Sequence, residues 1–291
     1  MNYILYIYNM QPQTKVRRLP RRGPPKASVR SISAGAAPAV TRAIAILRLL
    51  GRSESPLGLS AIAGRLGIVP SSCLHILRVL VAEELVAVDA VDKQYRLDAG
   101  MLTLARSLLR PGNFAQLVQP ALDRISRSWQ VTAVAVQVVS LDHIVVVAIS
   151  ESHRPMRVHV ELGSRFPALM SATGRCLAAF GNYQWPEISK KFRGIRWDNP
   201  PALKTWRAEV EAARRNYCSV DEGRYLSGIT VIAAPVLDAA HCMTHAVVAL
   251  GVSEQIAQSG VAVIAAELRA VAATLSAGNR GLNAPPAKLS S

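Results

Sequence analysis

The sequence predicts an α+β protein in which a winged helix-turn-helix is followed by a linker helix and a larger domain with an antiparallel sheet. Two short helix patterns that meet at Gly67, followed by a strand pair, predict the first unit within residues 59–97. Runs of β-branched residues after Trp129, separated by helix patterns, predict the second unit. At 291 residues, half of them hydrophobic, the chain is long enough to bury two cores.

The predicted boundaries divide the chain into five parts. They are a basic disordered tail (1–35), the winged helix-turn-helix (36–98), the linker helix (99–113), the larger domain (114–278) and a C-terminal tail (279–291). Residues 1–35 hold seven Lys and Arg, no Asp or Glu, and several prolines that would interrupt a helix. This tail could be an arm that binds nucleic acid, or it could reflect a misassigned start upstream of Met10. A signal peptide is not expected, because the apolar stretch precedes the charges.

The charge balance favours a polyanionic partner. Lys and Arg outnumber Asp and Glu by 34 to 19, which gives a net charge of +15 and a pI near 10.3. Such a surplus suits double-stranded DNA, with an anionic membrane surface as the alternative. We expect no membrane-spanning helix, since we find no stretch of about 18 apolar residues. Four scattered cysteines without a CxxC pair fit reduced, buried thiols in a cytoplasmic protein.

The first unit begins with an amphipathic helix, AVTRAIAILRLLG, that would turn Val40, Ala43, Ile44, Leu47 and Leu50 inward. A second helix runs over residues 59–66 and ends at Gly67, and Pro70 opens a third at a first helical position. LVAVD and QYRL, separated by Asp92 and Lys93, read as the hairpin of a wing.

The third helix carries the candidate DNA-binding residues. Its apolar stripe holds Leu74, Leu77, Leu80 and Val81, and polar side chains lie on its other face near the start. Hydroxyl, imidazole and guanidinium groups suit phosphate oxygens and base edges, although each position alone could be an ordinary solvated one. The predicted DNA contacts are Ser71, Ser72, His75 and Arg78 on this helix and Lys93 in the wing.

The linker helix, GMLTLARSLLRPG, is apolar over one broad face that includes Met101, Leu102 and Leu109. A face of this kind between two domains must be covered, either by its own domain or by a second copy of the chain. We expect the second arrangement, a homodimer or a tetramer.

The larger domain alternates strands and helices. Strands are expected at VTAVAVQVV, IVVVAIS, MRVHVEL, YCSVD, TVIAAPV and HAVVALGV, and helices at 114–127, SATGRCLAAF, PALKTWRAEVEAARRN and 260–277. Antiparallel hairpins flanked by helices are typical of a sensor-like α+β domain.

The motifs of common enzymes are missing. There is no GxSxG elbow, no P-loop and no GxGxxG before a helix, so we expect no catalytic residue and no cofactor. His241 and His245 have a spacing that a metal could use on a helix, but Asp238 ahead of them indicates a hairpin turn, so no metal site is expected. Asp221 and Glu222, adjacent on a strand, should point to opposite faces; a single inward carboxylate fits ligand binding better than acid–base catalysis.

The order of these parts resembles the IclR family of bacterial transcription regulators over about residues 37–277. The resemblance rests on PALMSATGRCLAAF (167–180) and NYCSVDEGRYLSGITVIAAPVLD (216–238), which look like the family's segment leading into a Gly-Lys helix and its Gly-Tyr…Asp-Glu…Gly…Ala-Ala-Pro-Val stretch. It implies a GAF-like C-terminal domain that binds a small effector. By similarity, the effector site would contain Phe166, Ala172, Thr173, Asp221, Ile229, Val231, Val248 and Leu250.

The chain departs from the family at several positions. Arg224 replaces an acidic residue, Arg175 a lysine, and His75 a frequent basic residue, while Val248 and Leu250 are apolar where small polar residues occur. An apolar lining favours an apolar or aromatic acid. SATG adds backbone N–H groups at a helix start, suitable for an anion.

The sequence therefore predicts a ligand-responsive transcriptional regulator of a catabolic or metabolic operon. The alternatives are an enzyme that processes a small acid and carries a basic nucleic-acid-binding attachment, and a protein that coats nucleic acid without sequence preference. The absence of a nucleophile–base arrangement argues against the enzyme.

Overall fold

The computed structural model describes residues 4–6, 37–106 and 113–282. The chain forms two compact units, one spanning Val16–Pro111 and the other Met1–Lys15 with Gly112–Ser291. We call the first the head and the second the sensor unit. The division after Pro111 falls two residues before the predicted end of the linker helix.

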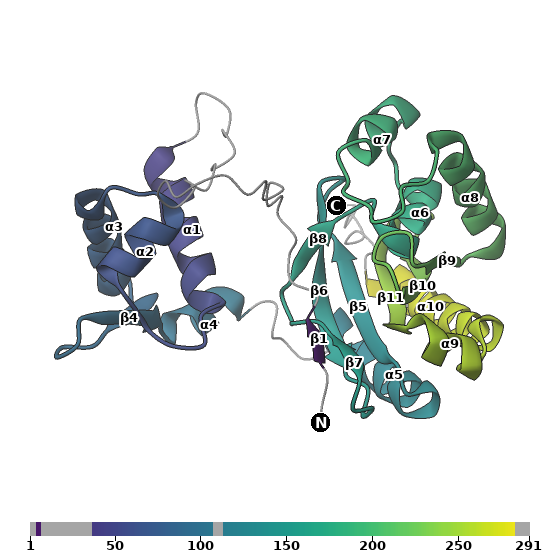
Figure 1. Ribbon diagram of the computed structural model, residues 1–291, viewed down its shortest axis with the longest axis horizontal. Coiled ribbons are helices and arrows are strands. Elements are labelled where there is room, and N and C mark those ends of the chain that lie inside the picture. Colours follow the sequence, from purple (N-terminus) through teal and green to yellow (C-terminus); the bar gives the residue numbers. More distant parts are fainter. Residues whose placement is uncertain (1–3, 7–36, 107–112, 283–291) are drawn as a thin grey trace, which may run out of the picture. The chain divides into compact units, whose positions relative to one another are not determined.

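The head is a three-helix core with a small sheet (Figure 1). Its helices are α1 (Pro38–Gly51), α2 (Leu59–Leu66) and α3 (Pro70–Ala82), followed after the wing by α4 (Gly100–Ala105). Its strands are β2 (Leu57–Gly58), β3 (Val86–Val88) and β4 (Gln94–Leu97), paired antiparallel in the order β2-β4-β3. Ile46, Ile62, Cys73 and Leu77 are fully buried at its centre. Strand β2 is too short to leave a sequence pattern and was not predicted.

Individual residues fix the turn between α2 and α3 and the turn of the wing. Gly67 follows α2 with φ of 64°, the left-handed conformation that glycine adopts without strain, and Pro70 occupies the first turn of α3. In the wing, the Asp89 carboxylate accepts hydrogen bonds from the backbone N–H groups of Val91 and Asp92, which fixes the turn between β3 and β4.

The predicted inward face of α1 is correct only in part. Leu50 is buried, and Ala43 and Leu47 are partly buried, but Val40 is 57% and Ile44 41% exposed. Ile46, which was not on the predicted stripe, is fully buried instead. The difference arises because the buried residues of α1, Ile46 and Leu50, both lie in its second half, so the first turns have few apolar neighbours.

The sensor unit is built on a six-stranded antiparallel sheet of order β8-β6-β5-β11-β10-β9. The strands are β5 (Thr132–Val138), β6 (His143–Ser150), β8 (Arg165–Pro167), β9 (Ser219–Glu222), β10 (Ile229–Leu237) and β11 (Met243–Val252). The helices are α5 (Phe114–Trp129), α6 (Ser171–Phe180), α7 (Trp185–Phe192), α8 (Leu203–Asn216), α9 (Ser253–Ser259) and α10 (Val261–Leu282).

The sheet separates two cores, as alternating strand residues require. On one face Val247 and Ala249 of β11 pack with α5 and α10; on the other Val248 and Leu250 pack in the core that includes α6, α7 and α8 (Figure 1). The layers are therefore helices, sheet, helices. The short elements β8, α7 and α9 were not predicted, and the last helix extends to Leu282, past the predicted boundary at 278.

A further strand pair involves the N-terminus. Strand β1 (Ile4–Tyr6) lies parallel to β7 (Arg157–His159), with Leu5 opposite Val158. The prediction of a disordered tail is therefore wrong for these three residues, whose apolar side chains suit a strand; the rest of 1–35 lies outside the described residues. Likewise, α4 covers only residues 100–105 of the predicted linker, and 107–112 lie outside the described residues.

One helix is long and apolar enough to cross a membrane by length and composition. It is α10, in which Val261–Gly278 has a mean hydropathy of 1.5, so the expectation that the chain has no such stretch is wrong. The prediction overlooked it because Glu267 and Arg269 interrupt the apolar run. Ile264, Leu268, Val271 and Ala272 on this helix are buried in the core beside β10 and β11.

Candidate functional site

The polar face of α3 is accessible, as a DNA-reading face must be. Ser71, His75 and Arg78 are exposed and Ser72 is partly buried, while Cys73, Leu77 and Leu80 hold the opposite face in the core. Leu74 and Val81, predicted for the buried stripe, are only partly buried, and Cys73 takes the central position. The four polar side chains are thus positioned by the helix and remain available to a partner.

Lys93 lies in the turn of the wing. It is exposed and has a φ of 53°, and its backbone N–H donates to the Asp89 carbonyl. The Asp89 contacts lower the pKa of that carboxyl group, chiefly through the hydrogen bond from the Asp92 N–H. The carboxylate therefore stays charged next to Lys93 and Arg96, which moderates the positive charge of the wing.

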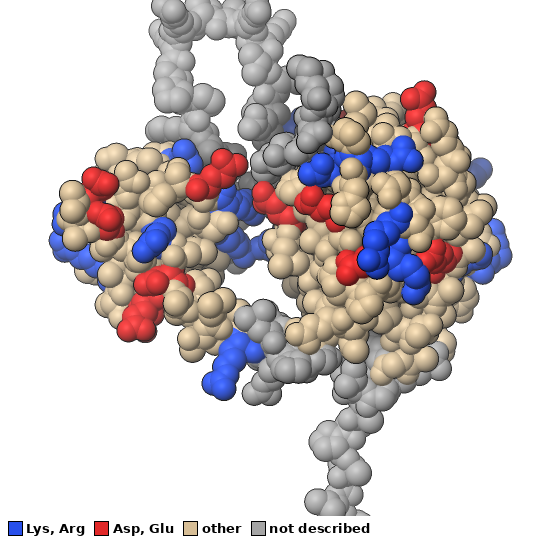
Figure 2. All heavy atoms as spheres, turned by 90° about the horizontal axis from the view of Figure 1, so that it is seen from below, with Lys and Arg blue, Asp and Glu red and all other residues tan. Residues whose placement is uncertain are grey.

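The winged helix-turn-helix part of the head, residues 37–98, is nearly neutral. Residues 37–98 hold seven Lys and Arg and six Asp and Glu, and Figure 2 shows basic and acidic groups interspersed on the visible face. By contrast, residues 7–36 hold seven Lys and Arg and no acidic residue. Much of the basic surplus of the chain therefore belongs to the segment that precedes α1.

The candidate effector residues on the sheet share one face. Asp221, Val231 and Leu250 are direct neighbours across β9, β10 and β11. Ile229 and Val248 lie two residues from Val231 and Leu250, and so on the same face. The structure thus brings together five positions that are up to 29 residues apart in the sequence.

Helix α6 covers this face. Ala172, in its first turn, is fully buried, and Thr173 beside it is also buried. Phe166 on β8 joins the same core cluster. Gly174 is required here, because a Cβ atom would lie 2.1 Å from the carbonyl carbon of Leu169. The predicted site residues are therefore packed together, with the start of α6 against the sheet.

The start of α6 has no side-chain cap. Ser171 adopts a φ of 53°, and the first backbone bond of the helix is from Gly174 N to Met170 O at 2.8 Å. The N–H groups of the first three residues of an α-helix have no partner within the helix. Burial of Ser171, Ala172 and Thr173 makes this end a place where an anionic oxygen would be favoured.

Asp221 is engaged inside the protein. Its Oδ1 accepts a hydrogen bond from Arg175 Nη2 at 3.1 Å, and its Oδ2 accepts one from the backbone N–H of Tyr225 at 3.0 Å. Both Asp221 and Arg175 are 1% exposed. Glu222, the next residue, is exposed, which agrees with the expected opposite facing of the two carboxylates.

Glu209 of α8 connects the two arginines at which the chain departs from the family. Its Oε2 accepts from Arg175 Nε at 2.7 Å, and its Oε1 lies 2.9 Å from Arg224 Nη2. Two guanidinium groups thus alternate with two carboxylates, and we call this set of four the ion-pair network. Glu209 was not predicted as a site residue; the signal was Arg175, a charged residue inside an otherwise small and apolar helix.

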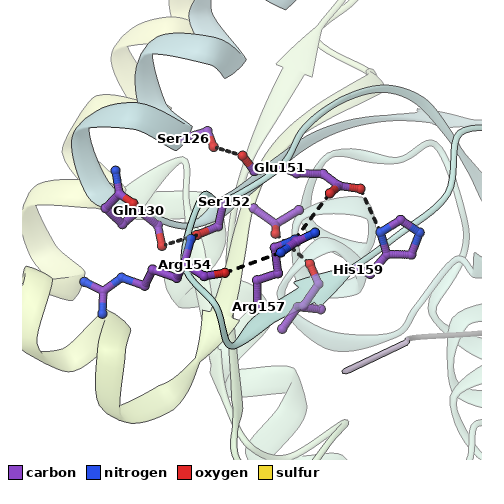
Figure 3. Close-up of polar contacts among 9 residues, drawn as sticks. Ser126, Gln130, Glu151, Ser152, Arg154, Arg157 and His159 are labelled. Atoms are coloured by element: carbon purple, nitrogen blue, oxygen red, sulfur yellow. Dashed lines mark hydrogen bonds and ion pairs between the residues drawn. The ribbon is translucent and has the colours of Figure 1, made fainter. Parts of the chain in front are cut away.

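A cleft of about 460 Å³ opens elsewhere in the sensor unit. It is lined by residues of α5 and of the segment from the end of β6 to β7: Asp123, Arg127, Ser150, Glu151, Ser152, His153 and Arg157. Figure 3 shows that its polar groups are joined to one another: Glu151 pairs with Arg157 and His159, and Ser152 donates to the Gln130 carbonyl. None of the predicted effector residues lines this cleft.

The hairpin turn predicted at Asp238-Ala239-Ala240 is present between β10 and β11, and His245 lies on β11. Asp238 accepts from the N–H groups of Ala240 and Cys242, and His245 stacks on Phe114 with ring centroids 3.8 Å apart. Burial lowers the pKa of His245 to about 4. Among the described residues, no three His, Cys, Asp or Glu side chains are grouped so as to hold a metal. Three of the four cysteines are buried, and Cys242 is partly exposed.

Two family models match the chain, one in each unit. The IclR helix-turn-helix domain matches residues 39–90, and the bacterial transcriptional regulator IclR C-terminal domain matches residues 107–277. The second match alone covers more than half of the sequence. The chain belongs to the IclR family of bacterial transcriptional regulators.

The relatives found are named as regulators, in agreement with the expectation that the chain is not an enzyme. A glycerol operon regulatory protein of Streptomyces griseus is 30% identical over 75% of this chain and 86% of its own length. The probable transcriptional regulator SauR of Cupriavidus necator is 26% identical over 68% of this chain and 80% of its own. The HTH-type transcriptional repressor AllR of Salmonella typhimurium is 26% identical over 80% of this chain and 85% of its own length.

Solved IclR structures share the fold. An IclR transcriptional regulator from Alicyclobacillus acidocaldarius has a TM-score of 0.67 at 23% identity and covers 83% of this chain and 98% of its own. A putative transcriptional regulator from Rhodococcus sp. RHA1 has a TM-score of 0.68 at 21% identity, and the match covers 85% of this chain and 100% of that one. Together with the family models, these matches confirm the winged helix-turn-helix and the α+β C-terminal domain.

Proposed function

We propose that this IclR-family protein is a ligand-responsive repressor or activator of a catabolic or metabolic operon, acting in the cytoplasm on double-stranded operator DNA. The observation that carries the proposal is the accessible polar face of α3, held by a buried opposite face and joined to a wing. The names of the glycerol operon and AllR relatives support control of an operon.

In this proposal α3 lies in the major groove, with Ser71, Ser72, His75 and Arg78 toward base edges and phosphates and Lys93 on the backbone. Arg78→Ala should weaken operator binding about 10- to 100-fold, the effect of one lost base or phosphate contact. The measurement is a gel-shift titration of the DNA upstream of the gene at fixed salt. Arg215→Ala, which removes an exposed arginine of α8, serves as the control and should bind like the wild type. Unchanged binding by Arg78→Ala would contradict the placement of α3.

The effector is a small organic acid, apolar or aromatic in its remaining part. The apolar side chains of Phe166, Ile229 and Val248 and the buried start of α6 support this choice. Because these residues are packed in the structure, the ligand must bind better to an arrangement in which their side chains have moved apart. Such a ligand changes DNA binding only if the DNA-binding and ligand-binding arrangements are coupled.

We also propose that the protein acts as a homodimer or tetramer. Leu102 and Leu104 on α4 are 63% and 65% exposed, and these are apolar side chains that a second copy would cover. Analytical ultracentrifugation of the full chain should show a dimer or tetramer, and Leu102→Lys with Leu104→Lys should shift it toward monomer. A monomeric wild type at micromolar concentration would contradict the proposal.

A further inference from the structure

Two buried donors near the start of α6 have no acceptor. Ser171 Oγ and Arg175 Nη1 are inaccessible to solvent and make no hydrogen bond with any described residue. Residues four apart lie on the same side of a helix, and long side chains in helices lean back toward the N-terminus. Arg175 and Ser171 therefore lie on the same side of α6. Buried donors without a partner are uncommon in folded proteins and call for an explanation.

The geometry of the guanidinium separates the occupied donors from the free one. Nε donates to Glu209, and Nη2 donates to Asp221. Nη1 is the third nitrogen of the planar guanidinium and carries N–H groups of its own. An oxygen that approaches Nη1 would therefore use N–H groups that neither carboxylate occupies.

Each oxygen of Asp221 already accepts one hydrogen bond from the protein. Its two oxygens are engaged by Arg175 and by the Tyr225 N–H, in a site with almost no solvent. The present contacts of Asp221 already hold Arg175 in place. Glu209 holds the same guanidinium from α8 and is itself paired with Arg224.

We infer that Arg175 Nη1 and Ser171 Oγ bind the carboxylate of the effector, and that Asp221 and Glu209 are positioning residues for Arg175. This inference rests on the proposed function, since it names how the ligand of the sensor unit is held. In this inference the polar side chain that binds the effector is Arg175 and not Asp221. Position 175 is one at which this chain departs from its family.

A carboxylate fits these donors better than a neutral group does. Both unpartnered side-chain groups at this end of α6, the Ser171 hydroxyl and Arg175 Nη1, can donate, and a carboxylate supplies two oxygens with about four acceptor positions. A hydrogen bond from a guanidinium to a carboxylate is stronger than one to a neutral oxygen, and the N-terminus of α6 adds partial positive charge. The charges of the ion-pair network sum to zero, so it neither attracts nor repels the anion strongly at a distance.

The test compares small acids with their own amides, which differ in charge but hardly in shape. The probes are benzoate and benzamide, phenylacetate and phenylacetamide, and isobutyrate and isobutyramide, each added to the full chain in a thermal-shift screen and then titrated by calorimetry. At least one acid should bind about tenfold or more tightly than its amide. Arg175→Lys, which keeps the charge but loses the fork, should reduce this acid-to-amide ratio about 10-fold.

Further variants distinguish residues that bind the carboxylate from residues that position Arg175. Ser171→Ala should lower the ratio several-fold and keep the inference testable even if Arg175→Lys fails to fold. Asp221→Asn, which retains an acceptor for Arg175, should keep the preference for the acid. Arg215→Lys, an exposed arginine of α8, should behave as the wild type.

The outcomes that overturn the inference are distinct from those that overturn the proposed function. If the ratio survives in Arg175→Lys and Ser171→Ala but is lost in Asp221→Asn, Asp221 holds the ligand and the inference is wrong. If an amide binds as tightly as its acid and still changes DNA binding in a gel shift, the inference fails while the regulator remains. If no probe that stabilises the protein changes DNA binding, the proposed sensing function fails.

Discussion

At the scale of single residues, the buried pair of Arg175 and Asp221 is the feature with the largest expected energetic effect. Both side chains are nearly inaccessible, so each charge depends on the other and on a few hydrogen bonds. Removing one member of such a pair leaves an uncompensated buried charge. The pair therefore contributes to the folded state as well as to the site.

We expect Asp221→Ala to lower the free energy of unfolding of the sensor unit by about 3–5 kcal/mol. Urea denaturation followed by tryptophan fluorescence measures this, because Trp197 and Trp206 lie in this unit. Glu222→Ala, which removes the exposed neighbouring carboxylate, should cost less than about 0.5 kcal/mol. Equal effects of the two substitutions would contradict the ion pair.

The neighbourhood of His245 predicts how stability depends on pH. Burial lowers the pKa of His245 from 6.5 to about 4, so between these values the unfolded chain binds a proton that the folded one does not. Its contribution is present above pH 6.5 and is lost as the pH falls, by up to about 3 kcal/mol near pH 4. His245→Phe keeps a ring against Phe114 and should make the free energy of unfolding less dependent on pH over this range. His153→Gln, which changes an exposed histidine, should not; identical pH profiles for wild type and His245→Phe would contradict the buried neutral state.

The side-chain partners could not be predicted from the sequence. Arg175 and Asp221 are 46 residues apart, and the sequence around either residue does not indicate that the other is its partner. The positions of Asp221, Ile229 and Val231 as a group did follow from the resemblance to the family, and the structure places them on one face of the sheet. The role assigned to Asp221, however, depends on which side chains surround it, and that information lies in the packing of α6 and α8.

At the scale of elements, the sequence predicted the long, regular pieces and missed the short ones. The runs of β-branched residues in 131–150 and the stop at Gly67 have a clear physical cause, the preference of such side chains for strands and the left-handed cap of a helix. Strand β8 and helices α7 and α9 are too short to establish a period, and they form because the sheet and its cores surround them. Tertiary packing decides such elements.

Two glycines of the helix-turn-helix, three residues apart, should respond in opposite directions to alanine. Gly67 has a φ of 64°, so Gly67→Ala should destabilise the head by about 1 kcal/mol. Gly64 lies within α2 with open space at its Cβ position, so Gly64→Ala should stabilise the head by about 0.5–1 kcal/mol. Hydrogen exchange of the α2 and α3 amides in the full chain measures both. A gain from both substitutions would exclude the left-handed cap.

At the scale of the whole molecule, the distribution of charge indicates that sequence recognition and electrostatic attraction to DNA reside in different parts of the chain. Residues 37–98 are nearly neutral, whereas residues 7–36 hold seven basic residues and no acidic one. Affinity that depends on phosphate contacts falls with salt in proportion to the number of contacts. The basic segment is therefore expected to govern the salt dependence of DNA binding, and α3 its sequence preference.

Replacing the seven Lys and Arg of residues 7–36 with Gln, which leaves β1 in place, should reduce the slope of log affinity against log salt by up to about six, at roughly 0.9 for each of seven phosphate contacts. The discrimination between operator and random duplex should change little. Titrations of both DNAs at several salt concentrations measure the two quantities together. An unchanged slope would show that the segment does not contact DNA, and a loss of discrimination would assign it a part in sequence recognition.

The pairing of β1 with β7 has a consequence for how the chain can be divided. Because Ile4–Tyr6 belong to the sensor unit, the head is in sequence an insertion between a first strand and the remainder of that unit. A fragment that starts at residue 113 would leave the backbone groups of β7 on that side without their partner. Exposed strand edges promote association between molecules, so a truncated sensor unit should be more prone to aggregate than the intact protein, and adding back a peptide of residues 1–10 should counteract this.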